Sequence, residues 1–172
     1  MVRRRVSLAI ASTVLLLAAV AAARAAEPEL KPAELAKALP MASLSLEQGL
    51  KISQSAGMPI SAKYEIEDGA LQLSVYTASN GKFREVIVDY RSGNIDKSVA
   101  ITEGDDLKAA GEQAAVMSKA RVPLETAVAN AVRANAGYRA AAVDPVLAQG
   151  RPMATVVLMK GQEVKTVVEK LD

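Results

Sequence analysis

The sequence predicts an α+β fold made of two related modules, each combining one helix with an antiparallel β-sheet. Two observations support this prediction. Apolar residues recur first at helical spacing and then at every second position, the pattern of an amphipathic helix followed by half-buried strands. The same order of elements returns about 80 residues later, which is typical of an internal repeat. We therefore expect a first module at residues 44–102, a connecting helix at 103–121 and a second module at 122–172.

Residues 1–25 have the pattern of a signal peptide. A basic stretch from Arg3 to Arg5 precedes an apolar run that continues to Ala23. The small side chains of Ala23 and Ala25 suit a signal peptidase, so cleavage is expected after Ala25, with cleavage after Ala23 as the alternative. The expected location of the protein is therefore periplasmic or secreted.

Two alternatives to a cleaved general-secretion signal stay open. The apolar run is close to the roughly 18 residues that span a bilayer, so a retained leader would anchor the protein in a membrane. Paired arginines also occur in twin-arginine signals, which export folded proteins. A membrane is an expected partner only if the leader is uncleaved.

A linker is expected at residues 26–43, because prolines interrupt this stretch and leave room for only one short helical piece. The first module begins at Ser45, whose hydroxyl forms a capping box with Gln48. Apolar residues at helical spacing follow, and Ala56-Gly57 ends the helix.

Four segments of period-two alternation follow the first helix. Asn80-Gly81 is the strongest turn signal among them, since both residues tolerate the positive φ of a two-residue hairpin turn. The expected strands lie within Ile60–Glu67, Leu71–Val75, Lys82–Tyr90 and Ile95–Ile101.

Helical periodicity returns between Thr102 and Arg121, with Asp105 or Asp106 as the expected cap of the connecting helix. Pro123 suits the first position of the next helix, and an apolar stripe follows it. The expected strands of the second module are Ala140–Val146, Met153–Met159 and Glu163–Leu171.

Composition excludes several classes of function. The leader holds four of the 21 Lys and Arg residues and none of the 19 Asp and Glu residues, which leaves 17 against 19 in the expected mature chain. This balance does not suit a polyanion-binding surface, so nucleic acid is not an expected partner. The chain has no Cys and no His, which removes disulfides, thiol nucleophiles, imidazole bases and the commonest metal ligands. No enzyme activity, metal or cofactor is expected; the one catalytic alternative is an enzyme that uses carboxylates alone, which would need paired acids in a cleft.

The segments Gly69–Tyr76 and Phe83–Ile95 resemble the PepSY domain, in which a strand ends in Asp and a glycine turn leads into a further strand. Asp89 and Gly93 hold those positions. The second module resembles a degenerate copy, because Val167-Val168-Glu169 fits the strand but no glycine turn follows it. The resemblance implies a cystatin-like arrangement, with a helix covering one face of an antiparallel sheet. It carries no catalytic residues with it.

Few residues stand out as candidates for a site. Asp89 is expected to accept backbone hydrogen bonds in the turn that ends at Gly93, in preference to contacting a ligand. Asn80 and Gly81 are likewise expected to form a structural turn. Tyr76 is expected to be exposed and is our candidate for partner contact. The acidic residues Glu103, Asp105 and Asp106 are attributed to a helix start in preference to a calcium site.

The functional expectation is a non-catalytic binding or regulatory protein of the cell envelope that recognises a protein or peptide. Recognition is expected along an exposed strand edge, for example near Ile95–Ile101, or on an open sheet face. The family resemblance permits a more specific alternative, an inhibitor or folding assistant of a secreted peptidase. A structural module that associates with itself is the other alternative.

Overall fold

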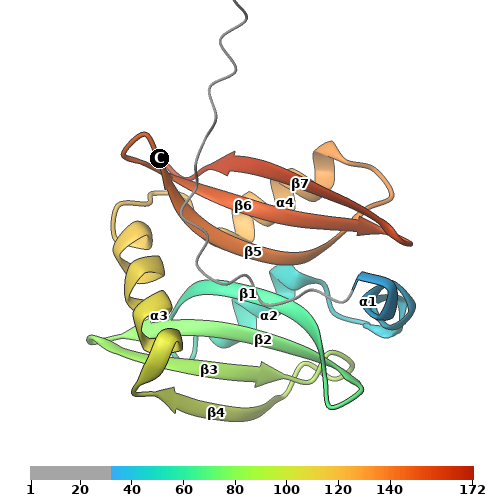
Figure 1. Cartoon of the computed structure of the whole chain (residues 1–172), viewed down its shortest axis with the longest axis horizontal. Helices are drawn as coiled ribbons and strands as arrows, with labels where there is room; N and C mark the ends of the chain where they lie inside the picture. The colour runs from blue at the N-terminus through green and yellow to red at the C-terminus, as the bar shows by residue number, and fades with distance from the viewer. Residues whose placement is uncertain (1–31) are drawn as a thin grey trace, which may run out of the picture.

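The computed structural model describes residues 32–172 as an α+β fold. Within this range it contains a seven-stranded antiparallel sheet and four α-helices (Figure 1). The expected signal peptide at residues 1–25 and the start of the expected linker lie outside the described residues.

The elements follow the order expected from the sequence. The helices are α1 (Pro32–Ala38), a short 3-10 turn η1 (Leu39–Met41), α2 (Leu46–Ser53), α3 (Gly104–Met117) and α4 (Leu124–Ala134). The strands are β1 (Met58–Glu67), β2 (Ala70–Ser79), β3 (Lys82–Val88), β4 (Ile95–Ile101), β5 (Arg139–Ala148), β6 (Arg151–Lys160) and β7 (Glu163–Lys170).

All seven strands belong to one sheet, in the order β4-β3-β2-β1-β5-β6-β7. We expected a separate sheet in each half of the chain. Instead β1 and β5, the first strand of each half, pair antiparallel at the centre, with Ala62 opposite Val143. Each half continues outward from this pair as a meander, which leaves β4 and β7 at the two edges.

Corresponding strands of the two halves are separated by the same number of residues, which is here called the offset. β1, β2 and β3 begin at Met58, Ala70 and Lys82, and β5, β6 and β7 begin at Arg139, Arg151 and Glu163, so the offset is identical for all three pairs of strands. The register of β1 against β2 shifts at Ile60, and that of β5 against β6 shifts at Ala141, which is separated from Ile60 by the same offset. The repeated order of elements therefore extends to the position of an irregularity in the strands.

The core lies between the sheet and the helices α2 and α4, which cover the same face (Figure 1). Tyr64, Leu73 and Val86 are fully buried there. α2 approaches the sheet closely at Gly49, where an added Cβ would lie 2.6 Å from Cδ2 of Leu73. Glycine at this position allows the helix backbone to pack directly on β2.

The starts of the helices show one expectation confirmed and one wrong. The capping box of α2 is present, because Gln48 N donates to Ser45 Oγ at 3.3 Å and Ser45 N donates to Gln48 Oε1 at 2.8 Å. Asp105 and Asp106 do not cap α3, since the N-cap is Glu103 and makes no side-chain cap bond. Gly104, with φ of +74°, is the first residue of the helix, which therefore begins at least two residues earlier than we expected.

Residues 32–41 differ from the tether that we expected of the linker. They form α1 and η1, whose Leu35 and Leu39 are almost completely buried in the core. The end of this segment is also held by polar contacts. Nη2 of Arg139 donates to the carbonyl oxygens of Ala42 and Leu44, at 3.0 and 2.8 Å. Apolar burial outweighs the local effect of the prolines, so this part of the linker belongs to the folded unit.

Candidate binding surface

The face of the sheet opposite α2 and α4 is here called the open face. Strand residues alternate between the two faces, so residues next to the buried Tyr64, Leu73 and Val86 point to the open face. α3 contacts β1, β2, β3 and β5 on this side and covers one end of the strands, while α1 lies at their other end (Figure 1). The strand residues whose side chains point to the open face include Lys63, Glu65, Tyr76, Glu85, Ile87, Val99, Asp144, Val146, Met153, Thr155, Val157, Val164, Thr166 and Val168.

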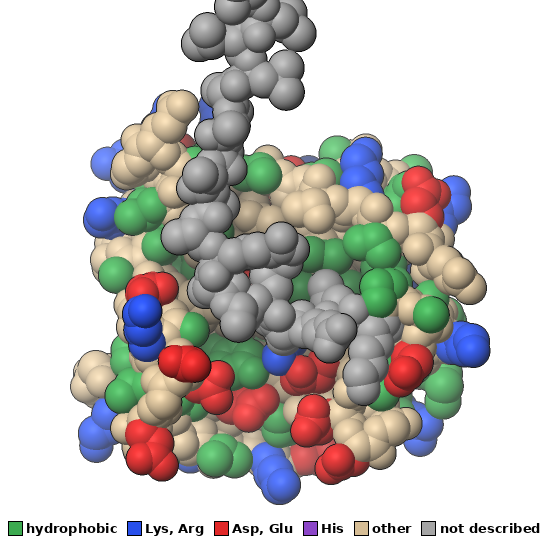
Figure 2. Space-filling view, in the orientation of Figure 1, with side chains coloured by type: hydrophobic (Ala, Val, Ile, Leu, Met, Phe, Trp, Pro, Cys, Tyr) green, Lys and Arg blue, Asp and Glu red, His purple; other side chains and the backbone are tan. Residues whose placement is uncertain are grey.

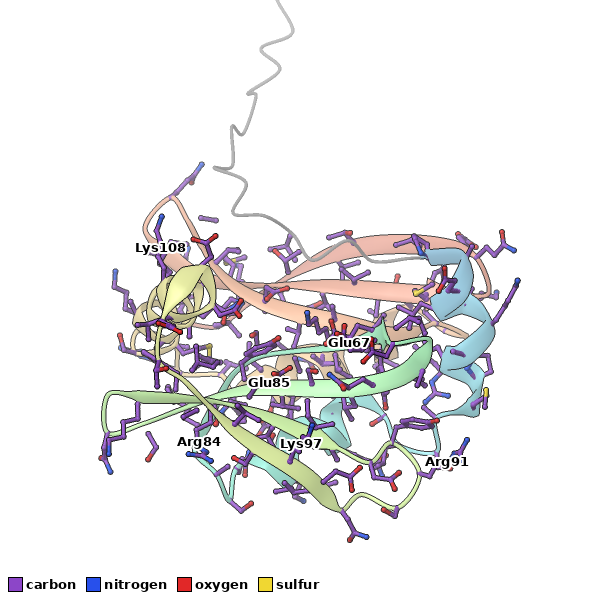
Figure 3. The ribbon with its side chains drawn as sticks, turned by 60° about the horizontal axis from the view of Figure 1, so that its bottom comes forward. Glu67, Arg84, Glu85, Arg91, Lys97 and Lys108 are labelled. Atoms are coloured by element: carbon purple, nitrogen blue, oxygen red, sulfur yellow. The ribbon has the colours of Figure 1, made fainter. Side chains whose placement is uncertain are left out.

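The two halves of the open face differ in chemistry. Asp and Glu side chains gather over β1 to β4, in the lower part of the view in Figure 2. Glu67, Glu85 and Lys97 are among the charged groups of this half (Figure 3). The half made by β5 to β7 instead presents β-branched side chains on its outermost strand, where Val164 and Val168 are 45% and 56% exposed. The face therefore combines a charged area with a neutral, apolar area.

Two carboxylates of the charged area are engaged within the protein. Glu65 forms an ion pair with Lys63 at 2.6 Å and accepts a hydrogen bond from Ser74 Oγ at 2.8 Å. Glu85 accepts a hydrogen bond from the hydroxyl of Tyr76. Because these contacts already occupy them, the two carboxylates contribute to the structure of the face.

Tyr76 is half-buried, which corrects our expectation that it is exposed. Its phenol lies beneath the Nζ of Lys63, 5.8 Å from the ring centroid, and its hydroxyl donates to Glu85. Burial raises the pKa of the Tyr76 hydroxyl above its ordinary value, and the nearby charge of Glu85 adds to this effect. The period-two pattern placed Tyr76 on the side opposite the core correctly, but α3 crosses this side of the sheet.

A glutamine on α3 fixes the helix to the open face. Ser61 Oγ on β1 donates to Gln113 Oε1 at 3.0 Å, and Gln113 Nε2 donates to Asp144 Oδ1 on β5 at 3.2 Å. One side chain thus joins α3 to both central strands. No pattern in the sequence identifies Gln113, because its partners come from strands that meet only in the folded sheet.

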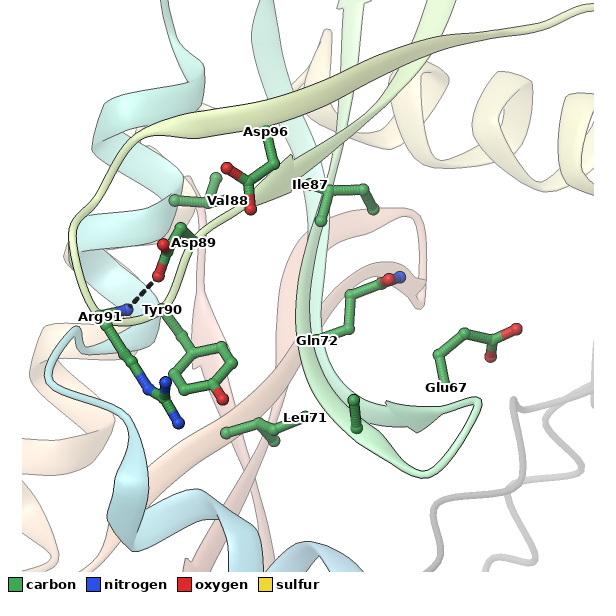
Figure 4. Close-up of a pocket in the computed structure, with 10 residues that line it drawn as sticks. Glu67, Leu71, Gln72, Ile87, Val88, Asp89, Tyr90, Arg91 and Asp96 are labelled. Atoms are coloured by element: carbon green, nitrogen blue, oxygen red, sulfur yellow. Dashed lines mark hydrogen bonds between the residues drawn. The ribbon is translucent and has the colours of Figure 1, made fainter.

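A depression of about 290 Å³ lies beside the charged half, at the end of the β1–β2 hairpin. Figure 4 shows Glu67, Gln72 and Asp96 around it, with the turn that follows β3. Asp89 belongs to this turn, and its Oδ1 accepts hydrogen bonds from the backbone N of Arg91 at 2.7 Å and of Ser92 at 3.2 Å.

These backbone hydrogen bonds hold the pKa of the Asp89 carboxyl below its ordinary value. Gly93 closes the turn with φ of +80°, and its N donates to the carbonyl oxygen of Asp89 at 2.8 Å. In the hairpin between β2 and β3, Asn80 and Gly81 both have positive φ, of 50° and 72°. The geometry of all four residues is that of turns.

A second depression, of about 360 Å³, lies between the end of α2 and the connection from α3 to α4. Gln54 Nε2 donates to Glu125 Oε1 at 2.8 Å across its rim. Met58, 44% exposed, is among the residues that line it. Neither depression brings together side chains that would form a nucleophile and base pair.

Residues 32–172 contain neither a metal-holding cluster of carboxylates nor a membrane-spanning helix. In this range the structure has no group of three or more Asp and Glu side chains arranged to hold a metal ion. None of the helices in the same range is long and apolar enough to span a bilayer.

No family model, no curated protein and no solved structure matches this chain.

Proposed function

We propose that this chain is an exported, non-catalytic binding protein of the cell envelope that recognises a protein or peptide through the open face of its sheet. In this proposal the leader at residues 1–25 directs export. The folded unit that follows it acts by recognition alone.

The proposal includes two related, PepSY-like modules. The constant offset between the corresponding strands of the two halves supports it, as does the matching irregularity at Ile60 and Ala141. The modules are fused side by side through β1 and β5. Each contributes one helix to the same face, so the opposite face of both modules forms a single surface.

The observation that carries the function is the exposure of apolar side chains on that surface. Val99 is 50% exposed, Val146 37% and Val168 56%. Isolated exposed valines are ordinary, but contiguous apolar areas on a soluble protein mark interaction sites. Val164 and Val168 stand beside the half-exposed Met153, Thr155 and Val157 of β6, so the area is contiguous across two strands.

The chemistry of the face favours recognition over catalysis. The side chains around Tyr76 satisfy one another. The side chains that carry the apolar area, Met153, Thr155, Val157, Val164 and Val168, are themselves not titratable. An apolar centre with charged groups beside it is the usual composition of a protein-binding surface. A partner that fits here presents apolar side chains to β6 and β7.

Photo-cross-linking tests this proposal. A photoreactive amino acid replaces Thr155 or Thr166 on the open face, and replaces the exposed Lys51 on α2 as the matched control. Irradiation of intact cells is expected to give a discrete adduct with another protein from the open-face positions only. Equal labelling from Lys51, or no adduct with another protein from either open-face position, would contradict the proposal.

The identity of the adduct decides between general recognition and the peptidase alternative. If the partner is a peptidase, the purified protein is expected to slow it in a stoichiometric titration. An adduct whose mass is that of two copies of this chain would instead report self-association.

A further inference from the structure

β7 is an edge strand whose outer side faces no other strand of residues 32–172. On its inner side it pairs with β6 over its whole length, from Glu163 to Lys170, without irregularity. An open edge of this length is a template for pairing with another chain, and natural sheets usually block it.

The backbone groups on the outer side of β7 can be assigned from its pairing with β6. Leu171 N donates to the carbonyl oxygen of Pro152 at 3.1 Å, so the backbone of Leu171 faces β6. Backbone direction alternates along an antiparallel strand. The N–H and C=O groups of Val164, Thr166, Val168 and Lys170 therefore point outward, away from β6.

The other edge of the sheet is partly blocked by its own side chains. Arg84 donates from Nη2 to the carbonyl oxygen of Ser98 at 2.6 Å and from Nε to Ser98 Oγ at 2.7 Å, at the middle of β4. Lys165 is the residue of β7 that corresponds to Arg84 of β3, because each is the third residue of its strand. Its Nζ donates to Asn135 Oδ1 at 2.6 Å, towards the end of α4, and leaves the β7 edge uncapped.

We propose that β7 pairs antiparallel with β7 of a second copy of this chain, in the register centred on Val167. In this register Lys165 stands opposite the partner's Glu169. Because the two copies are related by a two-fold axis, Glu169 also stands opposite the partner's Lys165. Val167 lies between the two pairs, opposite the partner's Val167. The outward backbone groups of Thr166 and Val168 then meet those of the partner's Val168 and Thr166.

The charges of β7 select this register among its neighbours. Centring on Thr166 places Glu163 opposite the partner's Glu169, and centring on Lys165 places two lysines opposite one another. Like charges directly opposite in a sheet are unfavourable, whereas opposite charges stabilise the pair. Centring on Val168 shortens the paired region and gives no pair of opposite charges. Among these registers, only the one centred on Val167 combines an overlap from Val164 to Lys170 with two pairs of opposite charge.

The proposed joint has the same form as the one at the centre of the sheet. β1 and β5 occupy corresponding positions in their halves and pair antiparallel about Ala62 and Val143. The second copy would also place the apolar areas of two open faces side by side. The inference concerns a strand edge and does not rest on the proposed function of the open face.

Charge reversal tests the register. Lys165→Glu and Glu169→Lys each place two like-charged pairs at the joint, and the double variant restores opposite charges. In sedimentation equilibrium of the purified protein over a range of concentrations, each single reversal is expected to raise the dimer dissociation constant about tenfold. The double variant is expected to return it to within about threefold of the unaltered protein.

Two proline variants test the edge itself. Thr166→Pro removes an outward N–H of β7 and leaves its pairing with β6 intact, so it is expected to abolish the dimer. Ala100→Pro makes the same change on β4 and is the matched control that leaves the dimer unchanged. Circular dichroism verifies that each variant is folded.

Three outcomes overturn the inference. The first is a monomer at every concentration. The second is a dimer that tolerates Thr166→Pro or depends on Ala100. The third is a dimer that the double charge reversal fails to restore.

Discussion

Ala62 on β1 and Val143 on β5 stand directly opposite one another, although they lie far apart in the sequence. Their separation along the chain equals the offset between the corresponding strands of the two halves, so each residue faces its own counterpart. The pair therefore lies on the approximate two-fold axis that relates the halves of the sheet.

Substituting the glycines of α2 and α3 is expected to change stability in opposite directions. Gly49→Ala forces a Cβ to within 2.6 Å of the buried Leu73, so we expect the free energy of unfolding to fall by about 1 kcal/mol. Gly111→Ala meets no atom within 4 Å and is expected to raise it by up to about 1 kcal/mol, through helix propensity. Urea unfolding measures both, and a stabilising Gly49→Ala would contradict the close packing of α2 on β2.

Arg139 is expected to stabilise the fold by holding the segment that precedes α2. Arg139→Met removes the hydrogen bonds from the guanidinium to the carbonyl oxygens of Ala42 and Leu44. Since hydrogen bonds from charged donors are worth about 1.5 to 3 kcal/mol, we expect a loss of about 2 kcal/mol in chemical denaturation. Arg133→Met, at the exposed end of α4, is the matched control. Equal effects of the two substitutions would contradict this role.

Asp89 is expected to stabilise the turn after β3 only while its carboxyl is ionised. Its pKa in the folded protein lies below the ordinary value of 3.8, because the backbone N–H groups of Arg91 and Ser92 bond the carboxylate. The contribution is therefore fully present above 3.8 and is lost as the pH falls through the lowered native pKa.

Thermal unfolding over a pH series measures this contribution. Asp89→Ala is expected to melt below the unaltered protein at neutral pH and to approach it in acid. Asp96→Ala, on the following strand, is the control for removing an exposed carboxyl from the same area. A difference between Asp89→Ala and the unaltered protein that persists unchanged into acid would show that the carboxylate does not act through ionisation.

Tyr64 and Tyr76 are expected to ionise only well above the ordinary pKa of a tyrosine. Burial raises the pKa of Tyr64 to about 12, and it also raises that of Tyr76 above the ordinary range. Because the folded state holds these protons more tightly, their contribution to stability is complete below the unfolded value of 10.0. It is lost as the pH rises through about 12.

Ultraviolet absorbance during an alkaline titration measures phenolate formation among the four tyrosines of the chain. Tyr64→Phe is expected to remove part of the late transition and to reduce the loss of stability in alkali. If Tyr64 and Tyr76 titrate near the ordinary value of 10.0 while the protein is folded, the burial of these two side chains is wrong.

Local chemistry made much of the fold predictable. The capping box at Ser45 and Gln48 sets the start of α2, and the positive φ of Asn80 and Gly81 sets the β2–β3 hairpin. These features depend on residues that are neighbours in the sequence. Strand positions and the repeat were predictable for the same reason, since alternation is a local property.

The joint between the halves was not predictable from the sequence. The alternation of apolar residues in β1 shows which side chains point to each face of the sheet. It does not show whether the edge of β1 pairs with β5 or is exposed to solvent. The half-burial of Tyr76 has a similar origin. It depends on where α3 crosses the sheet, which is set by Gln113 with Ser61 and Asp144 and by apolar packing between distant segments.

The short central joint has a mechanical consequence. β1 and β5 pair only at Ala62 with Val143 and Lys63 with Ala142, whereas β1 and β2 pair from Met58 to Glu67 with one irregularity at Ile60. Few backbone bonds therefore join β1 to β5. The two meanders are also held together by the packing of α2 against α4 and by the bridge through Gln113. Side-chain packing yields to sliding more readily than a hydrogen-bonded ladder does, so we expect the seam at Ala62 to yield to shear before the β1–β2 hairpin does.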